Sequence, residues 1–178
     1  KNWTLSNEFQ LGYISSNKID SFFNFFAGGK PGIKGYQYYS IEGNKMAKIY
    51  SGRCLCGNIK FETNSEPIWT ALCHCESCRR ACSAPLVAWM SCKDFSVKWL
   101  GQRAFYKSSE NGTRGFCGQC GTQMSFVSAR WKDQIHLYAT SLNNPESYEP
   151  SLHCYYSEKL NWLSVNEDLP KFGSSAPT

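Results

Sequence analysis

Cysteines are the side chains of this sequence best suited to chemistry, and seven of the ten fall into tight groups. The groups are Cys54-x-Cys56, Cys73-x-Cys75-x-x-Cys78 and Cys117-x-x-Cys120. Such spacing is the usual way in which a chain presents thiolates to one metal ion, most often Zn²⁺. A redox Cys-x-x-Cys would begin a helix in a βαβ pattern, and the sequence shows no such pattern. Disulfide frameworks belong to secreted proteins, and no convincing signal peptide is found. The sequence therefore predicts zinc sites in a cytoplasmic protein.

Four of these cysteines form the first predicted site. Cys54 and Cys56 are two residues apart, so on an extended segment both side chains point to one face. Cys117-Gly118-Gln119-Cys120-Gly121 is typical of a tight metal-binding turn, with glycines where the backbone must turn sharply. Together, Cys54, Cys56, Cys117 and Cys120 are expected to close a structural, tetrahedral zinc site that joins two distant parts of the chain.

The second predicted site has three cysteines, Cys73, Cys75 and Cys78. Three protein ligands and one open position distinguish a catalytic zinc from a structural one. The open position could instead be closed by His74, by Cys82 or by another cysteine, which would make this site structural as well. His74 lies between two ligands, so on an extended segment it points to the opposite face. The isolated Cys82, Cys92 and Cys154 are expected to be small buried apolar residues.

Short strands are the elements expected to position these cysteines. Hydrophobicity alternates over 58–63 and 95–100, and 86–90 is a continuous apolar run that predicts a strand buried on both faces. Only 75–81 is expected to form a helix, and Pro85 limits its length. Further strands are predicted at 47–52, 103–107, 123–128, 134–139 and 152–157. The predicted fold is mainly β and pinned by zinc.

The length of 178 residues predicts one domain, or at most one domain plus an appendage. Residues 1–45 contain no cysteine or histidine but ten aromatic residues, which indicates an atypical N-terminal extension upstream of a natural start at Met46. The zinc-binding domain is expected over 46–172, and 173–178 are predicted to be a tail. No run of 18 apolar residues exists, so no membrane-spanning helix is predicted.

The formal net charge of +5 is small and scattered along the chain. Seven thiolates on two Zn²⁺ ions would lower it to about +2, because coordinated thiols are deprotonated. A nucleic-acid partner is therefore not expected on the ground of charge.

The three cysteine groups also carry a family resemblance. Gly52-Arg53-Cys54-Leu55-Cys56-Gly57, Cys73-His74-Cys75-Glu76-Ser77-Cys78-Arg79-Arg80 and the stretch from Arg114 to Thr122 resemble, in this order, the glutathione-dependent formaldehyde-activating enzymes and their relatives, which include centromere protein V. The resemblance implies stacked antiparallel sheets in a tent-like fold and two zinc ions. It implies a structural role for Cys54, Cys56, Cys117 and Cys120, and a catalytic role for Cys73, Cys75 and Cys78.

The resemblance further implies a carbon–sulfur lyase. The expected substrate is a small-molecule adduct of formaldehyde or a related small aldehyde with a thiol, of the S-hydroxymethylglutathione type, and glutathione is the expected co-substrate. Two departures from the family pattern concern the substrate: Cys82-Ser83 replaces a Ser-Gly, and Asn143 replaces an aspartate. The alternative is a non-catalytic, zinc-stabilised module that binds a protein or nucleic acid.

Basic residues and one histidine are candidates beside the metal. Arg79 and Arg80 follow the last cysteine of the second site and are expected either to offset its negative charge and clamp a glutathione carboxylate, or to be solvated surface residues. Arg114 has the same choice between a substrate anion and solvent. His153 is a candidate acid or base, although a lone histidine in an apolar strand is more often a hydrogen-bonded core residue.

Overall fold

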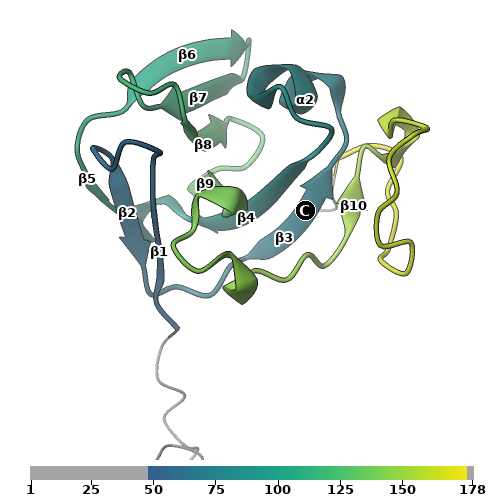
Figure 1. The fold of residues 1–178 in the computed structure, drawn as a ribbon, viewed down its shortest axis with the longest axis horizontal. Helices are drawn as coiled ribbons and strands as arrows, with labels where there is room; N and C mark the ends of the chain where they lie inside the picture. The colour runs from purple at the N-terminus through teal and green to yellow at the C-terminus, as the bar shows by residue number, and fades with distance from the viewer. Residues whose placement is uncertain (1–47, 176–178) are drawn as a thin grey trace, which may run out of the picture. The chain divides into compact units, whose positions relative to one another are not determined.

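The computed structural model describes residues 48–175, which form two β-sheets and one short α-helix (Figure 1). This confirms the prediction of a mainly β fold. Met46 and the predicted extension over 1–45 lie outside the described residues, as do the last three residues of the predicted tail. Within residues 48–175, no helix has the length and apolar character needed to span a bilayer.

The smaller sheet has three antiparallel strands in the order β1-β2-β5. They are β1 (Tyr50–Arg53), β2 (Lys60–Thr63) and β5 (Lys98–Leu100). Alternate residues of β2, Phe61 and Thr63, are buried, and the residues between them are exposed. The alternation predicted over 58–63 is therefore confirmed, and its apolar side faces the core.

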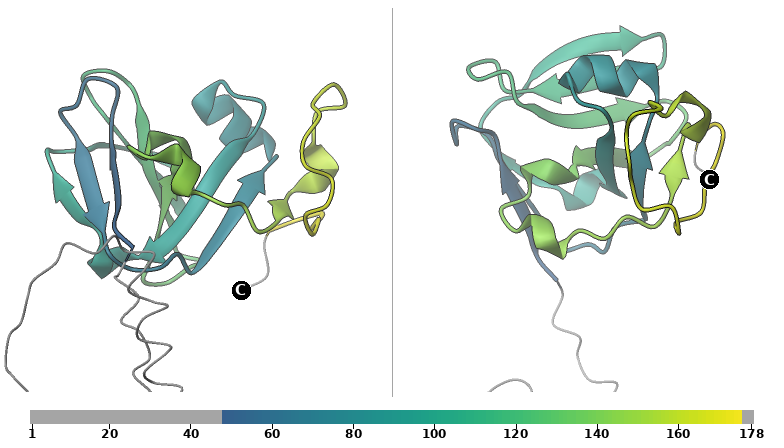
Figure 2. Two further views of the ribbon diagram at one scale, coloured as in Figure 1. Left: turned by 60° about the horizontal axis from the view of Figure 1, so that its bottom comes forward. Right: turned by 45° about the vertical axis from the view of Figure 1, so that its right-hand side comes forward.

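The larger sheet has seven strands in the order β10-β3-β4-β9-β8-β7-β6 (Figures 1 and 2). Neighbouring strands are antiparallel, except that β10 runs parallel to β3. The strands are β3 (Trp69–Cys73), β4 (Val87–Lys93), β6 (Ala104–Ser109), β7 (Gly112–Phe116), β8 (Gln123–Ser128), β9 (Gln134–Tyr138) and β10 (His153–Cys154).

Strand β4 is buried on both faces, as its apolar run predicts. Ala88, Met90 and Cys92 face the main core, which they share with residues of the smaller sheet such as Phe61. Val87 and Trp89 point the other way and pack in a second apolar cluster with Cys73 and Cys78. Because side chains alternate along a strand, this one strand supports the core on one face and the second cysteine group on the other.

Helix α2 (Glu76–Cys82) confirms the short helix predicted at 75–81. Cys75 is its N-cap, and the Cys75 sulfur accepts a hydrogen bond from the backbone N–H of Cys78. The helix ends at Ser83, whose backbone is left-handed with φ 49°. The first turn of α2 therefore holds two of the three cysteines of the second group.

Several predicted strands have different bounds in the structure. The strand predicted at 95–100 begins only at Lys98, because the 3₁₀ turn η1 (Asp94–Ser96) takes its first residues. The strand predicted at 152–157 is reduced to β10, since Tyr155 has φ 53° and the turn η4 (Tyr156–Glu158) follows. Strands β3 and β7 were not predicted. Two further 3₁₀ turns are η2 (Ala139–Ser141) and η3 (Pro145–Ser147).

Candidate active site

The first cysteine group joins the β1–β2 turn to the β7–β8 turn. The sulfurs of Cys54, Cys56, Cys117 and Cys120 all lie within 4.8 Å of one another. The β1–β2 turn is closed by the N–H of Cys54 donating to the carbonyl of Ile59 at 2.9 Å, and the β7–β8 turn by Cys117 donating to Thr122 at 2.9 Å. A bond from Leu55 N to Thr122 Oγ1, at 3.1 Å, ties one turn to the other.

The spacing of these sulfurs fits a tetrahedral metal. Zn–S bonds of about 2.3 Å place tetrahedral sulfurs about 3.8 Å apart. The Cys54–Cys56 and Cys56–Cys117 sulfurs are 3.5 and 3.7 Å apart. The N–H of Ile59 points at Cys54 Sγ from 3.2 Å, a contact that stabilises a thiolate. This cluster is called the four-cysteine cluster below.

The second group lies where β3 passes into α2. The sulfurs of Cys73, Cys75 and Cys78 lie within 4.8 Å of one another, and this group is called the three-cysteine cluster. The neighbouring Cys73 sulfur raises the pKa of Cys78 to about 11. Three thiols at this distance repel one another once ionised, so a bound cation would be needed to keep all three as thiolates. The donor set therefore fits a soft divalent ion.

Arg114 is the basic residue that the structure brings to the three-cysteine cluster. Its side chain projects from β7 and is 5% exposed. Its guanidinium donates to Tyr138 Oη at 2.8 Å, to Ser77 Oγ at 3.1 Å and to Cys78 Sγ at 3.9 Å. No carboxylate forms an ion pair with it among residues 48–175. Its charge is therefore directed at the sulfurs.

Arg79 and Arg80 lie differently from what the sequence suggests. Arg79 Nε donates to the carbonyl of His74 at 2.9 Å, and Arg80 pairs with the exposed Glu76 at 2.7 Å. Neither lines the cavity that the three-cysteine cluster faces. The sequence left open whether this pair clamps a substrate carboxylate or is solvated at the surface; Arg80 lies at the surface, and Arg114 is the arginine that reaches the cluster.

A cavity of about 350 Å³ opens over the three-cysteine cluster. It lies on the face of the larger sheet that carries the second apolar cluster, away from the main core. Polar residues of the β6–β7 turn and of the segment after β8 also line it, among them Glu110, Asn111 and Arg130. Its remaining wall is made mostly of aromatic side chains, namely Trp69, Trp89, Phe126, Trp131, Tyr155 and the imidazole of His136.

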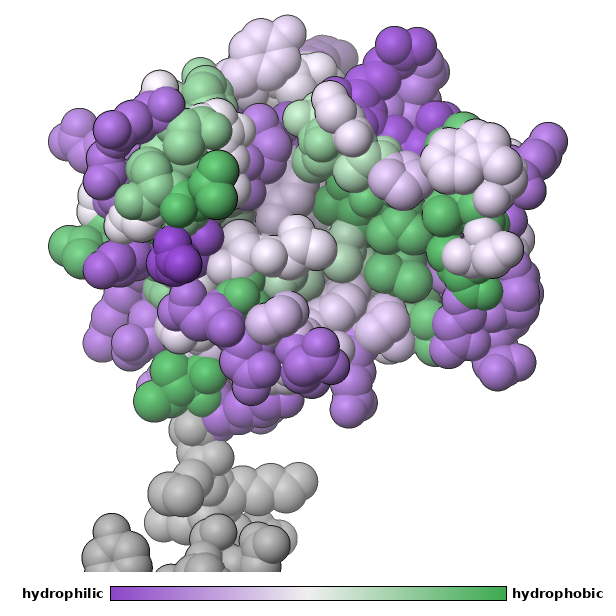
Figure 3. Space-filling model, viewed as in Figure 1, coloured by the Kyte–Doolittle hydropathy of each residue, from purple (hydrophilic) through white to green (hydrophobic). Residues whose placement is uncertain are grey.

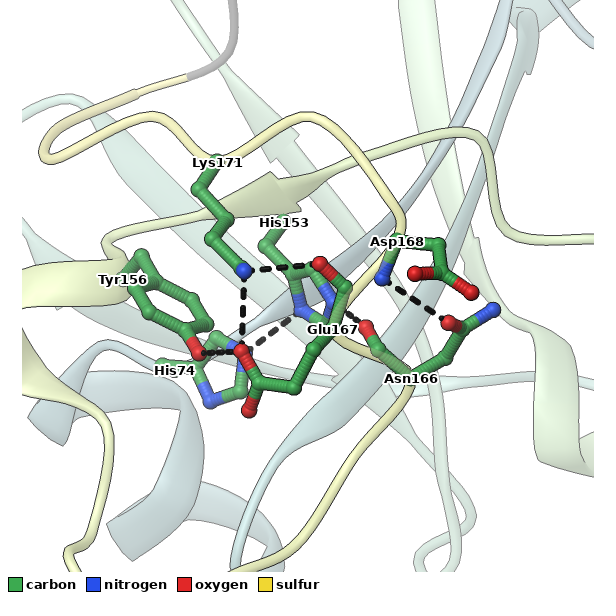
Figure 4. Close-up of polar contacts among 7 residues, drawn as sticks. All are labelled: His74, His153, Tyr156, Asn166, Glu167, Asp168 and Lys171. Atoms are coloured by element: carbon green, nitrogen blue, oxygen red, sulfur yellow. Dashed lines mark hydrogen bonds and ion pairs between the residues drawn. The ribbon is translucent and has the colours of Figure 1, made fainter.

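His74 and His153 form a buried pair (Figure 4), and His74 lies between Cys73 and Cys75 in the sequence. His153 Nε2 is 2.8 Å from the carbonyl oxygen of Asn166, which can only accept, so this nitrogen carries a hydrogen. In the neutral pair His153 Nδ1 then accepts from His74 Nε2 at 2.9 Å. His74 Nδ1 is left as a buried acceptor with no partner in the described part of the chain.

This pair anchors the C-terminal segment to the end of β3 (Figures 2 and 4). Lys171 forms an ion pair with Glu167 at 2.8 Å, and Tyr156 donates to the same carboxylate at 2.6 Å. The N–H of His74 donates to the carbonyl of Cys154 at 3.0 Å. His153 does not line the cavity, and its side chain reaches the cysteine segment through its hydrogen bond with His74.

The isolated cysteines have distinct surroundings. Cys154 is buried beside Cys73, whose pKa it raises, and it lines the cavity. Cys82 belongs to neither cluster and lines a second cavity of about 700 Å³ together with Cys54, Cys120 and Tyr138. Figure 3, which has the same view as Figure 1, shows a hollow near the centre of the molecule. In Figure 1 this region lies between the β1–β2 turn, η2 and α2. Cys92 packs in the main core.

Sequence reasoning missed the aromatic wall of the first cavity and His136 in particular. Trp69 and Cys73 share one face of β3, because they are four residues apart, but β3 itself was not predicted. The apolar residues Trp69, Ala71 and Cys73 at alternate positions were the signal that could have predicted β3.

Comparison with known proteins agrees with the geometry of the two clusters. Residues 49–158 match the family described as glutathione-dependent formaldehyde-activating enzyme. The chain belongs to this family. Both of its cysteine clusters lie inside the matched residues, so the family resemblance noted in the sequence is confirmed.

Two similar proteins are named as a lyase and as an enzyme of this family. An uncharacterized lyase of Schizosaccharomyces pombe is 34% identical over 127 residues, which cover 66% of this chain and 93% of that protein. A candidate glutathione-dependent formaldehyde-activating enzyme of Halomonas elongata is 22% identical over 127 residues, covering 66% of this chain and 81% of that protein. A crystal structure of a Rhodobacter sphaeroides protein matches with a TM-score of 0.44 and 14% identity, over 68% of this chain and 98% of that one.

Proposed function

We propose that this protein is a zinc-dependent carbon–sulfur lyase that joins or separates a thiol and formaldehyde or another small aldehyde, with glutathione as the thiol. The observation that carries the proposal is that all three cysteines of the three-cysteine cluster line a cavity of about 350 Å³. A volume of this size is typical of small-molecule sites. The family membership and the lyase name of a relative support the same reaction class.

The reaction breaks or forms one carbon–sulfur bond and transfers one proton between the hydroxyl group and the sulfur. In the cleavage direction, the carbon–sulfur bond of an S-hydroxymethyl thiol breaks, the hydroxyl proton is lost as the carbonyl forms, and the thiol sulfur gains a proton. Cys73, Cys75 and Cys78 would hold the zinc, which as a Lewis acid favours a thiolate or polarises a carbonyl oxygen. Cys54, Cys56, Cys117 and Cys120 would hold a second, structural zinc.

The protein's own residues supply charge and shape around this centre. Arg114 places a buried positive charge 3.9 Å from Cys78 Sγ, which stabilises negative charge on the sulfurs. The same guanidinium fixes Ser77 Oγ at the start of α2. The aromatic wall offers few hydrogen-bonding groups to water, and a poorly hydrated cavity would strengthen each electrostatic contact inside it.

Two opposite charges on the cavity wall support a peptide thiol. Arg130 and Glu110 line the cavity, and neither forms an ion pair among residues 48–175. Glutathione carries two carboxylates and one ammonium group, so Arg130 and Glu110 would pair with one of each. The site also needs reduced cysteines, so the proposed reaction would suit a reducing compartment such as the cytoplasm.

Zinc stoichiometry and turnover of matched cysteine variants test this function. We expect two zinc ions per chain, a folded Cys73→Ser variant that loses one zinc and its activity, and a Cys117→Ser variant that loses the other zinc and much of its stability. Cys92→Ala is the matched control, because Cys92 is equally buried but belongs to neither cluster. It should keep both zinc ions and full activity.

Two results would contradict the proposal. One is a folded Cys73→Ser protein with unchanged activity. The other is a zinc-loaded protein that processes no thiol adduct, which would favour the alternative of a non-catalytic binding module.

A further inference from the structure

The aromatic wall of the first cavity is larger than the formaldehyde adduct requires. Four large rings surround the imidazole of His136: its centroid lies 4.6 Å from Trp69, 4.9 Å from Trp131, 5.9 Å from Phe126 and 6.1 Å from Trp89. All five side chains line the cavity, and they are called the aromatic chamber below. A hydroxymethyl group has only two heavy atoms, so it can contact only a small part of this surface.

Because of the strand register, the aromatic chamber begins beside the three-cysteine cluster and continues along β3 away from it. Trp69 and Cys73 stand on one face of β3, about 13 Å apart at 3.3 Å per residue. Trp89 of β4 pairs with Ala71 of β3, and the small side chain of Ala71 leaves room between Trp69 and Cys73. His136 and Phe126 follow in the next two strands as a cross-strand pair. The aromatic surface thus continues from the sulfurs along the length of β3.

The charges around the chamber do not attract a cationic ligand, although aromatic cages often bind one. Arg114 and Arg130 line the same cavity, against the single carboxylate of Glu110. His136 contributes no charge near neutral pH, because burial lowers its pKa to about 4. The group that fits these walls is therefore uncharged and apolar, and flat rings pack best against other rings.

We propose that the aromatic chamber binds a planar, apolar substituent on the aldehyde-derived carbon of the thiol adduct, so that adducts of aromatic aldehydes are preferred to the adduct of formaldehyde. This rests on the proposed function, since it requires the reacting sulfur to lie at the three-cysteine cluster. Trp69, Trp131 and His136 then determine which aldehyde is used.

Binding of two stable thioethers tests the chamber without any turnover. S-benzylglutathione and S-methylglutathione share the peptide and the sulfur, and differ only in the group that would enter the chamber. Titration calorimetry on the zinc-loaded protein should show S-benzylglutathione binding about 10- to 100-fold more tightly, as expected for burying one phenyl ring. Equal affinities, or no binding of either compound, would overturn the proposal.

A pair of tryptophan variants localises the effect. Trp131→Ala should reduce the benzyl advantage at least about fivefold, because this ring closes the chamber over His136. Trp162→Ala is the matched control, since Trp162 is 73% exposed and lies outside the cavity. It should leave both affinities unchanged, and an equal loss in the two variants would contradict the assignment.

Kinetics separate this proposal from the function on which it rests. With glutathione as the thiol, kcat/KM for benzaldehyde should exceed that for formaldehyde, and Trp131→Ala should lower the ratio of the two. Turnover of formaldehyde without turnover of benzaldehyde would reject the aromatic preference and leave the lyase function standing. Turnover of neither aldehyde would reject the lyase function itself.

Discussion

Replacing Arg114 with methionine should weaken metal binding at the three-cysteine cluster and leave the four-cysteine cluster unchanged. The guanidinium is 5% exposed and lies 3.9 Å from Cys78 Sγ. At an effective dielectric constant of about 20, two unit charges at that distance attract by about 4 kcal/mol. The variant no longer bears the cost of burying the arginine, which offsets part of this loss. We therefore expect a loss of about 2–4 kcal/mol, or roughly 30- to 1000-fold in affinity.

Competition with a chromophoric chelator measures this loss, because release of zinc from both clusters can be followed in one titration. In Arg114→Met one zinc should be removed at a much lower chelator concentration than in the parent protein, and the other at the same concentration. Lys98→Met removes an exposed charge from the smaller sheet and serves as the control for net charge. Near-ultraviolet circular dichroism confirms that each variant is folded.

Arg114→Lys distinguishes charge from shape. Lysine keeps the positive charge and loses the planar fork that reaches Tyr138 and Ser77. If the Coulomb argument holds, this variant recovers most of the affinity. An Arg114→Lys protein as weak as Arg114→Met, or equal losses at both clusters, would refute the reasoning.

Three further predictions concern stability and protonation. Unfolded His136 takes up a proton near pH 6.5, whereas the folded residue stays neutral until about pH 4, so stability is full above pH 6.5 and falls by about 3 kcal/mol as the pH drops to 4. The unfolding free energy of His136→Phe should lack this share of the acid dependence; a parallel dependence would contradict it. Gly101→Ala should cost more than about 2 kcal/mol in urea unfolding, because the new Cβ would collide with the Asn58 carbonyl oxygen. Gly57 has a φ of +80°, close to the +86° of Gly101, but open space around it, so Gly57→Ala should cost only about 1 kcal/mol. Equal costs of the two substitutions would show that the clash at Gly101 does not determine its cost. Long-range ¹H–¹⁵N spectra should show both His74 and His153 protonated at Nε2, and a Nδ1-protonated His153 would overturn the assignment.

Local spacing was enough to predict which cysteines meet. Cys54-x-Cys56 and Cys117-x-x-Cys120 each fit one turn, and a metal with four sulfur ligands needs two such turns, so their association follows from ligand count. The short helix after Cys75 and the doubly buried strand β4 were also predictable, because each is specified by a run of neighbouring residues. These are features for which short-range sequence information suffices.

The cavity wall could not be predicted in the same way. Trp69, His136 and Arg114 come from strands β3, β9 and β7 and share one face only through the register of five strands. Register depends on long-range pairing, and a shift of one residue would turn each of these side chains to the other face. Strand β7 adds to the difficulty, because its two glycines resemble a loop. For the same reason Arg79 and Arg80 were favoured over Arg114, which is distant in sequence from the cysteines that it serves.

The two clusters differ in how much chain separates their cysteines, and this has a consequence for how the protein would acquire metal during synthesis. Cys73, Cys75 and Cys78 lie within six residues and leave the ribosome together, whereas Cys54 and Cys56 must wait for Cys117, which is 61 residues after Cys56, and then for Cys120. Synthesis at about 5–20 residues per second makes that wait several seconds long. The three-cysteine segment lies inside the loop that the later site closes. A nascent chain would therefore load the three-cysteine cluster first and lock it in place afterwards.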